Sequence, residues 1–456
     1  MKEISVNALA QIIKAEPAAD IDDSVVGVST DSRTVNPGDC FFAIAGDNFD
    51  GHNYVKEAFA KGAVCAVVSQ DVEGGTILKV DDTTKALGDL ARHYRQKAGY
   101  KVVAITGSVG KTTTRQIVYH VLSQHFRVSQ AKKNFNNQIG LPLTLLDAEE
   151  KTQIVVAELG TNYPGEIAYL TRIASPDIAV ITSVYSAHLD GLCDLQTIVQ
   201  EKLSISEGLQ PNGVFIINGD FEQLVDSHRA KSGKIAEFYT FGKSDPCDYR
   251  ARDITYTGFG SSFTIDGTPV KLPLAGPGNV DNALAAWAVC SKFGLTAGDF
   301  SQAVKTQPPV SMRAELLQIG TLTVLNDCYN ANPASVKNAL DILTNLDSDR
   351  KRRLVFVCGD MAELGPQTED LHAQLGPSIA KAGVKLLMAV GKYAKIAADA
   401  AEECAEYDLQ TKCFDDTLSA CNNLKDSIKD YDIILVKGSR TAKLEMAVDK
   451  LKQLFS

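Results

Sequence analysis

Short apolar runs alternate along this chain with longer stretches that have helical periodicity. After residue 100 the runs KVVAITG, QIVVAEL, DIAVITSV and GVFIIN have the length of strands, and KTTTRQIVYHVLSQHF, which follows the first of them, has the periodicity of a helix. A second series begins after Pro308 and Pro309, with TLTVLNDC, RRLVFVCGD, VKLLMAVG and YDIILVKGS separated by helical segments such as SVKNALDILTNL. Apolar strands that alternate with helices predict parallel sheets covered on both faces.

The first hundred residues follow a different pattern. Apolar runs such as DCFFAIAG and GAVCAVVS lie between turn-rich loops, and a charged helical stretch, TKALGDLARHYRQKAG, ends the region. A chain of 456 residues is long enough for about three domains. We therefore expect an α/β protein with a mixed α/β domain over residues 1–98, a mainly parallel sheet over 99–308 and a Rossmann-like α/β domain over 309–456.

Composition and charge narrow the range of partners. The net charge of −10 and the pI near 5.3 argue against a broad nucleic-acid surface, so a polyphosphate has to be bound by a local device. The first residues, MKEISVNALAQIIKAEP, lack the apolar core of a signal peptide, and the chain has no run of about 18 apolar residues. The ten cysteines form no C-x-x-C pair, which suits reduced thiols. We expect a cytoplasmic protein that neither inserts into a membrane nor binds nucleic acid.

The clearest chemical signal is the stretch AITGSVGKTTT. It contains Gly110-Lys111-Thr112, which matches the end of the phosphate-loop pattern G-x-x-x-x-G-K-[ST]. The glycine that opens that pattern is missing, because Ile105 stands six residues before Lys111, and Gly107 lies only three residues before Gly110. The stretch is therefore either a shortened phosphate loop or an ordinary strand–helix turn.

The surroundings of this stretch favour the phosphate loop. A strand precedes it and a helix follows it, so backbone N–H groups at the start of the helix would converge on phosphate oxygens. In this arrangement Lys111 supplies a positive charge to the β- and γ-phosphates, and the Thr112 hydroxyl binds Mg²⁺. We predict a nucleoside triphosphate site in a central domain of the P-loop ATPase type.

Two further residues follow buried strands and could serve the same site. Glu158 closes the run QIVVAEL, and an acid at the end of a buried strand suits a Mg²⁺ ligand better than a solvated loop position. His188 follows the next strand in the segment YSAHLDGL. From its position alone His188 is either a metal ligand or a hydrogen-bonded structural residue.

Lys202 stands out because of the helical stripe that it continues. Leu195, Ile198 and Val199 lie at i, i+3 and i+4 of the segment DLQTIVQEKLSISEGL, and Lys202 takes the i+7 position. A lysine on an apolar face either extends to solvent or serves a site in which desolvation lowers its pKa. Periodicity leaves both possibilities open.

Longer motifs occur in all three blocks of the chain. The central block carries TGSVGKTTT, KNFNNQIGLPLTLL, VVAELG, AHLDGL and EKLSISEGL, and the last block carries MRAE, NDCYNANPAS, GDMAELG and LVKGSRTAKLE. Taken in this order they resemble the Mur ligases, the ATP-dependent amino-acid ligases of bacterial peptidoglycan synthesis, in which the phosphate loop has this shortened form. The first block, with STDSRTVNPGDCFFAIAGDNFDGHNYVKEAFAKGA, is similar to the uridine-nucleotide-binding domain of that family. The resemblance covers essentially the whole chain.

The resemblance implies an enzyme that forms an amide bond with ATP and Mg²⁺ through an acyl-phosphate intermediate. The NANPAS stretch is similar to that of the dipeptide-adding members, whose substrates are UDP-N-acetylmuramoyl-tripeptide and D-alanyl-D-alanine. A Mur-type ligase that adds a single amino acid is the alternative. A nucleotide-dependent switch is a rival from another class, but a switch needs no second large-ligand site of the kind that the DSR and NFNN segments suggest. We expect the enzyme to be a monomer.

The resemblance also implies roles for individual residues. Those that would bind ATP are Gly107, Ser108, Val109, Gly110, Lys111, Thr112, Thr113, Asn282, Arg313 and Asp327. Those that would hold Mg²⁺ are Thr112, Glu158 and His188, and the catalytic set is Lys111, Glu158, His188 and Lys202, the last as a carbamylated lysine. Those that would contact the muramoyl peptide, its uridine diphosphate or the incoming dipeptide are Ser32, Arg33, Asn134, Asn136, Asn137, Tyr329, Asn330 and Asn332.

Simpler interpretations exist for some of these residues. The asparagines of the NFNN segment also suit a solvated turn. Ser32 and Arg33 are polar residues that any exposed loop can carry, and Asp327 is suited to capping a turn after a strand.

Overall fold

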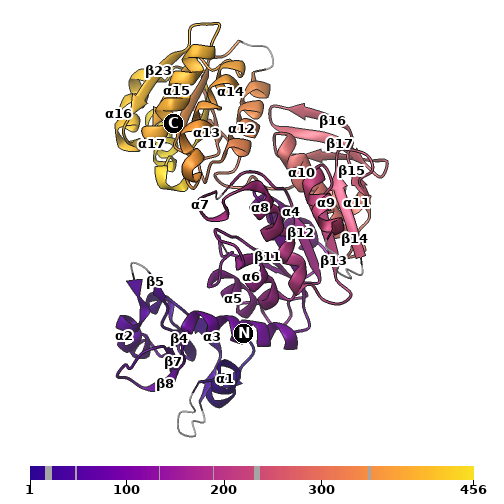
Figure 1. The fold of residues 1–456 in the computed structure, drawn as a ribbon, viewed down its shortest axis with the longest axis vertical. Helices are drawn as coiled ribbons and strands as arrows, with labels where there is room; N and C mark the ends of the chain where they lie inside the picture. Colours follow the sequence, from indigo (N-terminus) through magenta and orange to yellow (C-terminus); the bar gives the residue numbers. More distant parts are fainter. Residues whose placement is uncertain (16–22, 47–48, 133, 188, 231–236, 348–350) are drawn as a thin grey trace.

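The computed structural model describes residues 1–15, 23–46, 49–132, 134–187, 189–230, 237–347 and 351–456. Three α/β units follow one another along the longest axis of the molecule, with the N-terminal unit at one end and the C-terminal unit at the other (Figure 1). The predicted α/β class is confirmed. No helix in the described part of the chain is long and apolar enough to cross a membrane.

The central unit is built on a parallel sheet. In the described residues its order is β10 (Val128–Gln130), β11 (Ile154–Glu158), β9 (Lys101–Thr106), β12 (Ile178–Ile181), β13 (Val214–Asn218), β14 (Glu237–Gly242) and β15 (Tyr249–Arg250). All of these strands pair in parallel, and β9 lies between β11 and β12. The four strands that the apolar runs predicted are confirmed, and their carboxyl ends meet at one edge of the sheet.

Alternate residues of β9 face two separate cores, as the two-residue repeat of a strand requires. Val103 and Ile105 pack against α4 (Lys111–Leu122) and α10 (Pro277–Ser291) on one face. Val102 and Ala104 pack on the other face against α5 (Gly140–Leu146), α6 (Glu166–Ala174) and α8 (Leu195–Leu203). Burial on both faces explains why these strands are apolar throughout.

An antiparallel sheet follows β15, and the sequence pattern did not predict it. It consists of β16 (Arg252–Thr257), β17 (Gly260–Ile265) and β18 (Thr268–Leu272). Most residues of β16 are exposed, so this strand lacks the apolar run that marks the others.

The N-terminal unit contains a smaller parallel sheet. Its order is β3 (Gly27–Ser29), β4 (Asp39–Phe42), β7 (Cys65–Val68) and β8 (Thr76–Lys79), with α1 (Val6–Ile13), α2 (Val55–Ala60) and α3 (Thr83–Lys97) around it. Strands β4 and β7 lie in the two apolar runs noted above, DCFFAIAG and GAVCAVVS.

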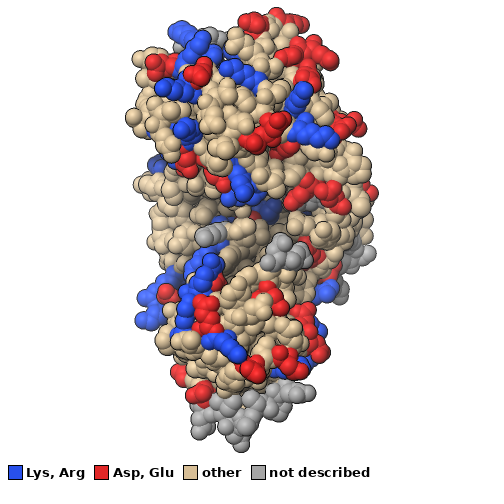
Figure 2. Space-filling model, turned by 90° about the vertical axis from the view of Figure 1, so that its left-hand side faces the viewer, with Lys and Arg blue, Asp and Glu red and all other residues tan. Residues whose placement is uncertain are grey.

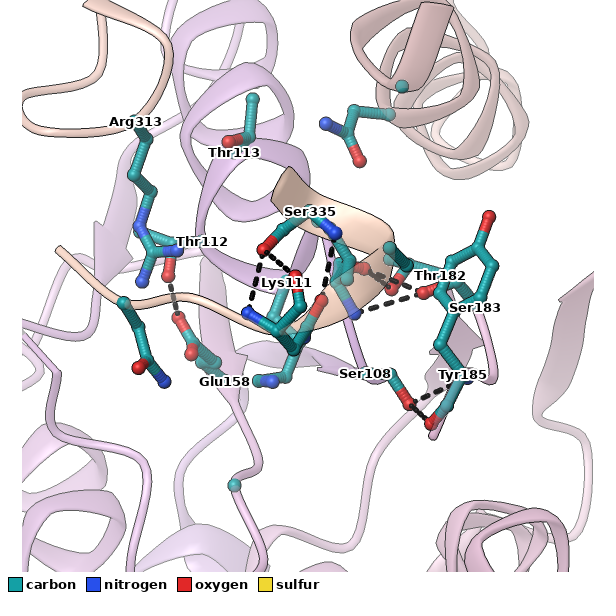
Figure 3. A pocket seen from close by; sticks show the side chains of 18 of the residues that line it. Ser108, Lys111, Thr112, Thr113, Glu158, Thr182, Ser183, Tyr185, Arg313 and Ser335 are labelled. Atoms are coloured by element: carbon teal, nitrogen blue, oxygen red, sulfur yellow. Dashed lines mark hydrogen bonds between the residues drawn. The ribbon is translucent and has the colours of Figure 1, made fainter. Parts of the chain in front are cut away.

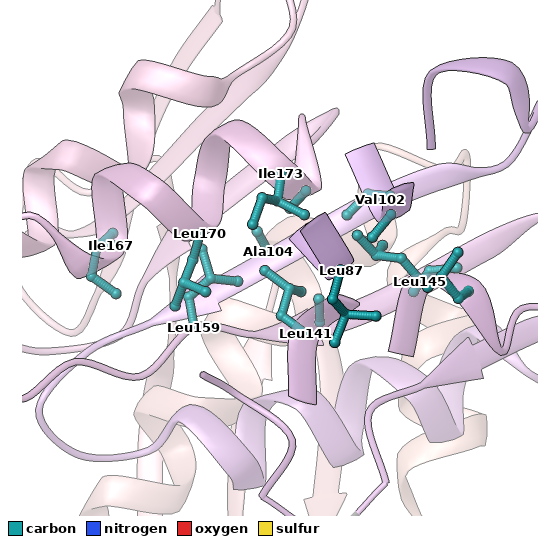
Figure 4. Packing of buried hydrophobic residues seen from close by; sticks show 14 of the residues in the cluster. Leu87, Val102, Ala104, Leu141, Leu145, Leu159, Ile167, Leu170 and Ile173 are labelled. Carbon is teal, nitrogen blue, oxygen red and sulfur yellow. The ribbon is translucent and has the colours of Figure 1, made fainter. Parts of the chain in front are cut away.

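Helix α3 belongs to the packing of two units at once. On one side it lies against α1, and on the other its Leu87 packs among Leu141, Leu145 and Leu170 of the central unit (Figure 4). Gly88 permits this approach, because a Cβ atom at that position would lie 2.7 Å from the Tyr169 hydroxyl oxygen. The N-terminal and central units therefore share one continuous apolar core.

The C-terminal unit has its own sheet. Its order in the described residues is β19 (Glu315–Ile319), β20 (Leu322–Asn326), β24 (Ile433–Lys437), β21 (Leu354–Gly359), β22 (Leu386–Val390) and β23 (Gln410–Phe414), and only β19 pairs antiparallel. The covering helices include α12 (Pro333–Leu346), α14 (Gly376–Lys381), α15 (Lys392–Cys404) and α17 (Glu445–Phe455). The four strands predicted in this block are confirmed.

The contacts between the C-terminal and central units are local. Gly258, at the turn between β16 and β17, packs against Leu346 at the end of α12. The backbone N–H of Asp190 donates to the carbonyl oxygen of Glu363 at 3.4 Å. The N–H of Gly278 donates to Asn338 Oδ1 at 3.1 Å. A large cavity lies between these contacts.

Candidate active site

The loop between β9 and α4 has a backbone that only glycine accommodates easily. Gly107 and Gly110 have φ angles of +148° and +91°. A Cβ atom at Gly107 would lie 2.0 Å from Thr182 Oγ1, and one at Gly110 would lie 2.2 Å from Asn282 Oδ1. Helix α4 begins directly after Gly110, whose missing side chain leaves the helix start without a side-chain cap. Such a start is suited to phosphate oxygens.

Residues that follow β12 hold the loop in place. Ser183 Oγ accepts a hydrogen bond from the N–H of Val109 at 3.0 Å, and Thr182 Oγ1 donates to the carbonyl oxygen of Val109 at 2.6 Å. Ser108 Oγ donates to the carbonyl oxygen of Tyr185 at 3.0 Å (Figure 3). The loop is therefore preorganised by a neighbouring strand.

Lys111, the first residue of α4, folds back over the loop. Its Nζ donates to the carbonyl oxygen of Gly107 at 2.7 Å. Desolvation lowers the pKa of Lys111, the nearby Arg313 acts in the same direction, and Glu158 opposes both. The lysine is thus held at the phosphate loop, where its charge would meet phosphate oxygens.

Thr112 and Glu158, predicted to share a metal ion, lie next to each other. The Thr112 hydroxyl donates to Glu158 Oε2 at 2.9 Å, and the two side chains point toward each other in Figure 3. Glu158 is 3% exposed and is also approached by Arg115, whose Nε lies 3.6 Å from Oε2. A buried carboxylate beside a hydroxyl is a suitable oxygen pair for Mg²⁺, which takes most of its other ligands from water and phosphate.

The remaining predicted metal ligand, His188, lies outside the described residues. Within them, no group of three or more His, Cys, Asp or Glu side chains is arranged to hold a metal ion. The described residues therefore offer Thr112 and Glu158 as an oxygen pair at this position, and their role as metal ligands stays a prediction.

Lys202 is buried on α8, with 1% of its surface exposed. It lies on the same apolar face as Ile198 and Val199 and does not extend to solvent. Desolvation lowers its pKa well below the usual value, the charge of Lys111 adds to this effect, and Glu201 and Glu166 oppose it. A neutral amine is therefore readily formed at this position.

The three asparagines of the NFNN segment have different surroundings. Asn136 Nδ2 donates to Glu158 Oε1 at 3.1 Å and so helps to fix the carboxylate. Asn137 Oδ1 accepts hydrogen bonds from the N–H groups of Ile139 and Gly140, which begins α5. Asn134 is exposed on the cavity wall. The capping role of Asn137 agrees with the simpler interpretation of that residue.

The predicted residues of the C-terminal unit face the loop across the cavity. The Arg313 guanidinium stacks on Tyr329, with Cζ 4.2 Å from the ring centre. Asp327 Oδ2 accepts from Lys437 Nζ at 2.6 Å, and its Oδ1 accepts from the N–H of Ala314 at 3.0 Å. Asn332 caps α12, because its side chain accepts from the N–H of Ser335 at 2.9 Å.

Asn282 stands beside the loop on α10. Its Oδ1 accepts from the Thr114 hydroxyl at 3.2 Å, and its Nδ2 donates to Asn279 Oδ1 at 3.0 Å. The side chain is 8% exposed and forms part of the cavity wall. Through these contacts Asn282 holds α10 against the phosphate loop and the start of α4.

The cavity has a volume of about 1000 Å³ and is lined by the central and C-terminal units together. Figure 2 shows the molecule hollowed near its middle, with Lys and Arg side chains around the hollow. The predicted residues that line it are Ser108, Val109, Gly110, Lys111, Thr112, Thr113, Asn134, Asn136, Asn137, Glu158, Asn282, Arg313, Asp327, Tyr329, Asn330 and Asn332. Residues that the sequence predicted to serve one site, although they are more than 200 positions apart, thus line the same cavity.

Ser32 and Arg33 lie elsewhere, in the N-terminal unit. Ser32 is buried, and the Arg33 side chain is 82% exposed and pairs with Asp31 at 2.7 Å. Hydrogen bonds from Arg33 lower the pKa of Asp31 to about 2. Neither residue lines the central cavity.

Sequence reasoning missed several polar residues that line the cavity or support the segments that line it. Lys437 ends the buried strand β24, and the same signal that marked Glu158 would have found it. Glu201 accepts hydrogen bonds from the N–H groups of Gly165 and Ile167 and so fixes the turn before α6. Lys243 and Asp281 form an ion pair at 2.9 Å, and no local pattern in the sequence joins them.

Comparison with known proteins identifies the relatives of this arrangement. Profiles of the Mur ligase family match in chain order: the catalytic domain over residues 24–95, the middle domain over 105–290 and the glutamate ligase domain over 312–440. The UDP-N-acetylmuramoyl-tripeptide–D-alanyl-D-alanine ligase of Bacillus subtilis is 35% identical over 432 residues, which is 93% of each chain. The chain belongs to the Mur ligase family.

Solved structures of Mur ligases have the same three-domain fold. A MurF crystal structure from Acinetobacter baumannii is 29% identical with a TM-score of 0.88, and the match covers 99% of each chain. A MurF ligase from Thermotoga maritima in complex with ADP is 26% identical with a TM-score of 0.81 and covers 94% of this chain and 97% of its own. The resemblance stated from the motifs is confirmed, and membership of this family makes the protein an ATP-dependent ligase.

Proposed function

We propose that this protein joins D-alanyl-D-alanine to UDP-N-acetylmuramoyl-tripeptide at the expense of ATP. The observation that carries the proposal is a phosphate loop that faces Arg313, Asp327 and Tyr329 of another unit across one cavity. A cavity of about 1000 Å³ has room for a nucleotide together with the reacting ends of two further substrates. The relatives named above are ligases of this kind by name, and they match this chain over nearly its full length.

The first step transfers a phosphoryl group. The tripeptide carboxylate attacks the γ-phosphorus of ATP, the bond to the β-phosphate oxygen breaks, and an acyl phosphate and ADP result. Positioning and charge neutralisation dominate such transfers. Lys111 and the N–H groups at the start of α4 would bind the β- and γ-phosphates, while Thr112 and Glu158 would hold Mg²⁺, which neutralises phosphate charge when bound.

The second step forms the amide. The amine of D-alanyl-D-alanine attacks the acyl carbon, the bond to the phosphate oxygen breaks, and the amine loses its proton as inorganic phosphate leaves. Tyr329, Asn330 and Asn332 line the part of the cavity wall that the C-terminal unit supplies, and they would contact the dipeptide. Because both steps are displacements between bound substrates, the protein needs no nucleophile of its own.

Lys202 acts in this proposal as a carbamate. Its neutral amine adds to carbon dioxide, a C–N bond forms and a proton is released, which leaves a carboxylate near Lys111. Burial supports this role, since an ammonium at that depth is costly and cannot react. The new anion would help to hold a second Mg²⁺ together with His188, which lies outside the described residues.

The test is phosphate release from ATP with UDP-N-acetylmuramoyl-tripeptide, with and without D-alanyl-D-alanine, for wild type and Lys202→Ala. Release should require both substrates, and the variant should lose about 100-fold or more, with recovery by short carboxylic acids. Ile198→Ala is the matched control, because it shortens a buried side chain on the same face of α8 without removing an amine. Recovery of that control by carboxylic acids would contradict the carbamate.

Two other outcomes would change the function. Release that requires a single amino acid in place of the dipeptide would identify another Mur-type ligase. Slow hydrolysis that ignores every acceptor would indicate a nucleotide-dependent switch. The proposal also takes the protein as a monomeric cytoplasmic enzyme of cell-wall precursor synthesis, which would link it to cell shape and cell division.

A further inference from the structure

Arg115 is a fully buried arginine that the proposed mechanism does not use. It lies on α4, one turn after Lys111, and 2% of its surface is exposed. Burial of a guanidinium is costly unless an opposite charge and hydrogen-bond acceptors surround it. The groups that surround Arg115 come from β10 and β11, so its contacts reach beyond its own helix.

One set of contacts lies at the end of β10. Arg115 Nη1 donates to Gln130 Oε1 at 3.0 Å and also to the carbonyl oxygen of Ala131. Ala131 is buried and extends the pairing of β10 with β11, because its N–H donates to the carbonyl oxygen of Val156 at 3.2 Å. The chain continues from Ala131 toward the NFNN segment, which carries the asparagines predicted to contact the muramoyl peptide. Arg115 thus anchors the strand end from which that segment continues.

The other contact is with Glu158, the carboxylate beside the phosphate loop. Arg115 Nε lies 3.6 Å from Glu158 Oε2, the same oxygen that accepts from the Thr112 hydroxyl. The second oxygen, Oε1, accepts from Asn136 Nδ2 at 3.1 Å. The carbonyl oxygen of Asn136 in turn accepts from the N–H of Gly160, two residues after Glu158. Helix α4 therefore holds one oxygen of this carboxylate, and Asn136 holds the other.

The pairing of Arg115 with Glu158 also balances charge. Desolvation lowers the pKa of Arg115, and the Glu158 carboxylate opposes that change. An arginine keeps its charge at neutral pH, so the two side chains offset each other at a depth where either charge alone would be costly. The planar guanidinium reaches the end of β10 through Nη1 and the carboxylate through Nε, whereas a lysine has a single nitrogen.

We propose that Arg115 is a positioning residue that fixes the NFNN segment, and with it the muramoyl peptide, against the carboxylate beside the phosphate loop. The inference rests on the proposed function, in which the peptide carboxylate has to meet the γ-phosphate of ATP. A displacement of about 1 Å between bound reactants can cost about 100-fold in rate. Within the described residues Arg115 does not line the cavity, so it acts through Ala131 and Glu158 and not by contact with a substrate.

Arg115→Lys tests this role, because it keeps the charge and removes the planar fork. The Kd of UDP-N-acetylmuramoyl-tripeptide, measured by calorimetry with ADP and a chelator of divalent metal ions present, should rise about 10-fold, the value of one hydrogen bond to a charged group. The kcat/KM for phosphate release with both acceptor substrates should fall by about 100-fold. The Kd of ADP without the peptide should stay within about twofold, because Thr182 and Ser183 hold the phosphate loop.

Arg95→Lys is the matched control. Arg95 is 7% exposed, donates to the carbonyl oxygens of Tyr100 and Ala174, and pairs with Asp177. The substitution therefore removes the same planar fork from a buried position away from the cavity. Its urea midpoint should fall, whereas both Kd values and kcat/KM should stay within about twofold of wild type.

Gln130→Leu is a second variant, which removes one acceptor of the Arg115 fork and leaves the buried charges paired. It should raise the Kd of the muramoyl peptide by about threefold. An unchanged Kd of the muramoyl peptide in both variants overturns the inference while the ligase remains. So does a loss of ADP affinity in Arg115→Lys as large as its loss of peptide affinity. Absence of dipeptide-dependent phosphate release in wild type overturns the proposed function itself, and the inference with it.

Discussion

The two junctions between the three units differ in chemical character, because the first is an apolar core and the second surrounds a polar cavity. At the junction of the N-terminal and central units, α3 places Leu87 and its neighbours in a core shared with α5 and α6 (Figure 4). Arg95 of α3 adds a buried ion pair with Asp177 at 2.7 Å. At the junction of the central and C-terminal units, a polar cavity separates the phosphate loop from Arg313 and Asp327.

The difference indicates that the first junction mainly stabilises the fold, whereas the second junction mainly provides the groups for the reaction. Apolar burial contributes about 1.5–3 kcal/mol for each large side chain, so the first junction is fixed. The second junction leaves charged groups such as Lys111 at a cavity, where they are costly for folding but useful for a polyphosphate. Substitutions at the two junctions should therefore have effects of different kinds.

Lys111→Ala should give the largest effect, on activity. Loss of the charge at the β- and γ-phosphates should lower phosphate release by about 1000-fold or more. The unfolding midpoint should stay the same or rise slightly, because the substitution removes a desolvated charge together with the only hydrogen bond that Lys111 Nζ makes to a described residue, the one to the Gly107 carbonyl. Lys305→Ala, at an exposed lysine, is the control. A large drop in stability would contradict the view that Lys111 contributes to the reaction and not to the fold.

Leu87→Ala should give the converse result. Truncation of this fully buried side chain should destabilise the protein by about 2–5 kcal/mol in urea unfolding. The kcat/KM of the folded enzyme should stay within about twofold, since α3 does not line the cavity. Leu418→Ala, at a leucine that is 60% exposed, should leave stability unchanged. If Leu87→Ala spared stability, the shared core would not fix this junction.

The smallest expected effect is a pH dependence at the second junction. Asp281 in the folded protein keeps its proton up to about pH 6, whereas in the unfolded chain it loses it near its ordinary value of 3.8. The folded state therefore binds more protons between pH 4 and 6, and stability falls as pH rises through that range. Relative to Asp281→Asn, wild type should lose about 1–3 kcal/mol across this window.

Urea unfolding of both proteins at pH 4, 5, 6 and 7 measures this difference. The groups that face Asp281 and have to be held constant are Lys243, Asp220, Tyr185 and Tyr256, none of which is changed by the substitution. Parallel curves for the two proteins would mean that Asp281 is not desolvated.

Much of the fold could be predicted from the sequence because most of its strands are buried on both faces. Strands such as β9 and β22 are buried on both faces, so they appear as continuous apolar runs. The exposed strand β16 gives no such run and was missed. Helix α3 was recognised as a helix, but its charged residues concealed that its apolar face serves two units.

The site was accessible to the extent that its residues close strands or stand in contiguous motifs. Glu158 and Thr112 are 46 positions apart, yet Glu158 ends one strand and Thr112 comes soon after the end of its neighbour, and parallel strands bring such positions together. Lys243 and Asp281 escaped because they are 38 positions apart and neither stands in a pattern that spacing explains. For Asn282 the sequence could not show that its amide is used by neighbouring side chains, because that depends on packing.

Helix α3 also bears on the modularity of this chain. A domain boundary at residue 98 separates the sequence neatly, but a fragment that ended there would present Leu87 and Leu90 to water. The C-terminal unit is different, since apart from Ala275 its two large cores consist of its own residues. The segment after Pro309 would therefore keep nearly all of its apolar core if it were exchanged between related chains by recombination. The first two thirds would have to be inherited together.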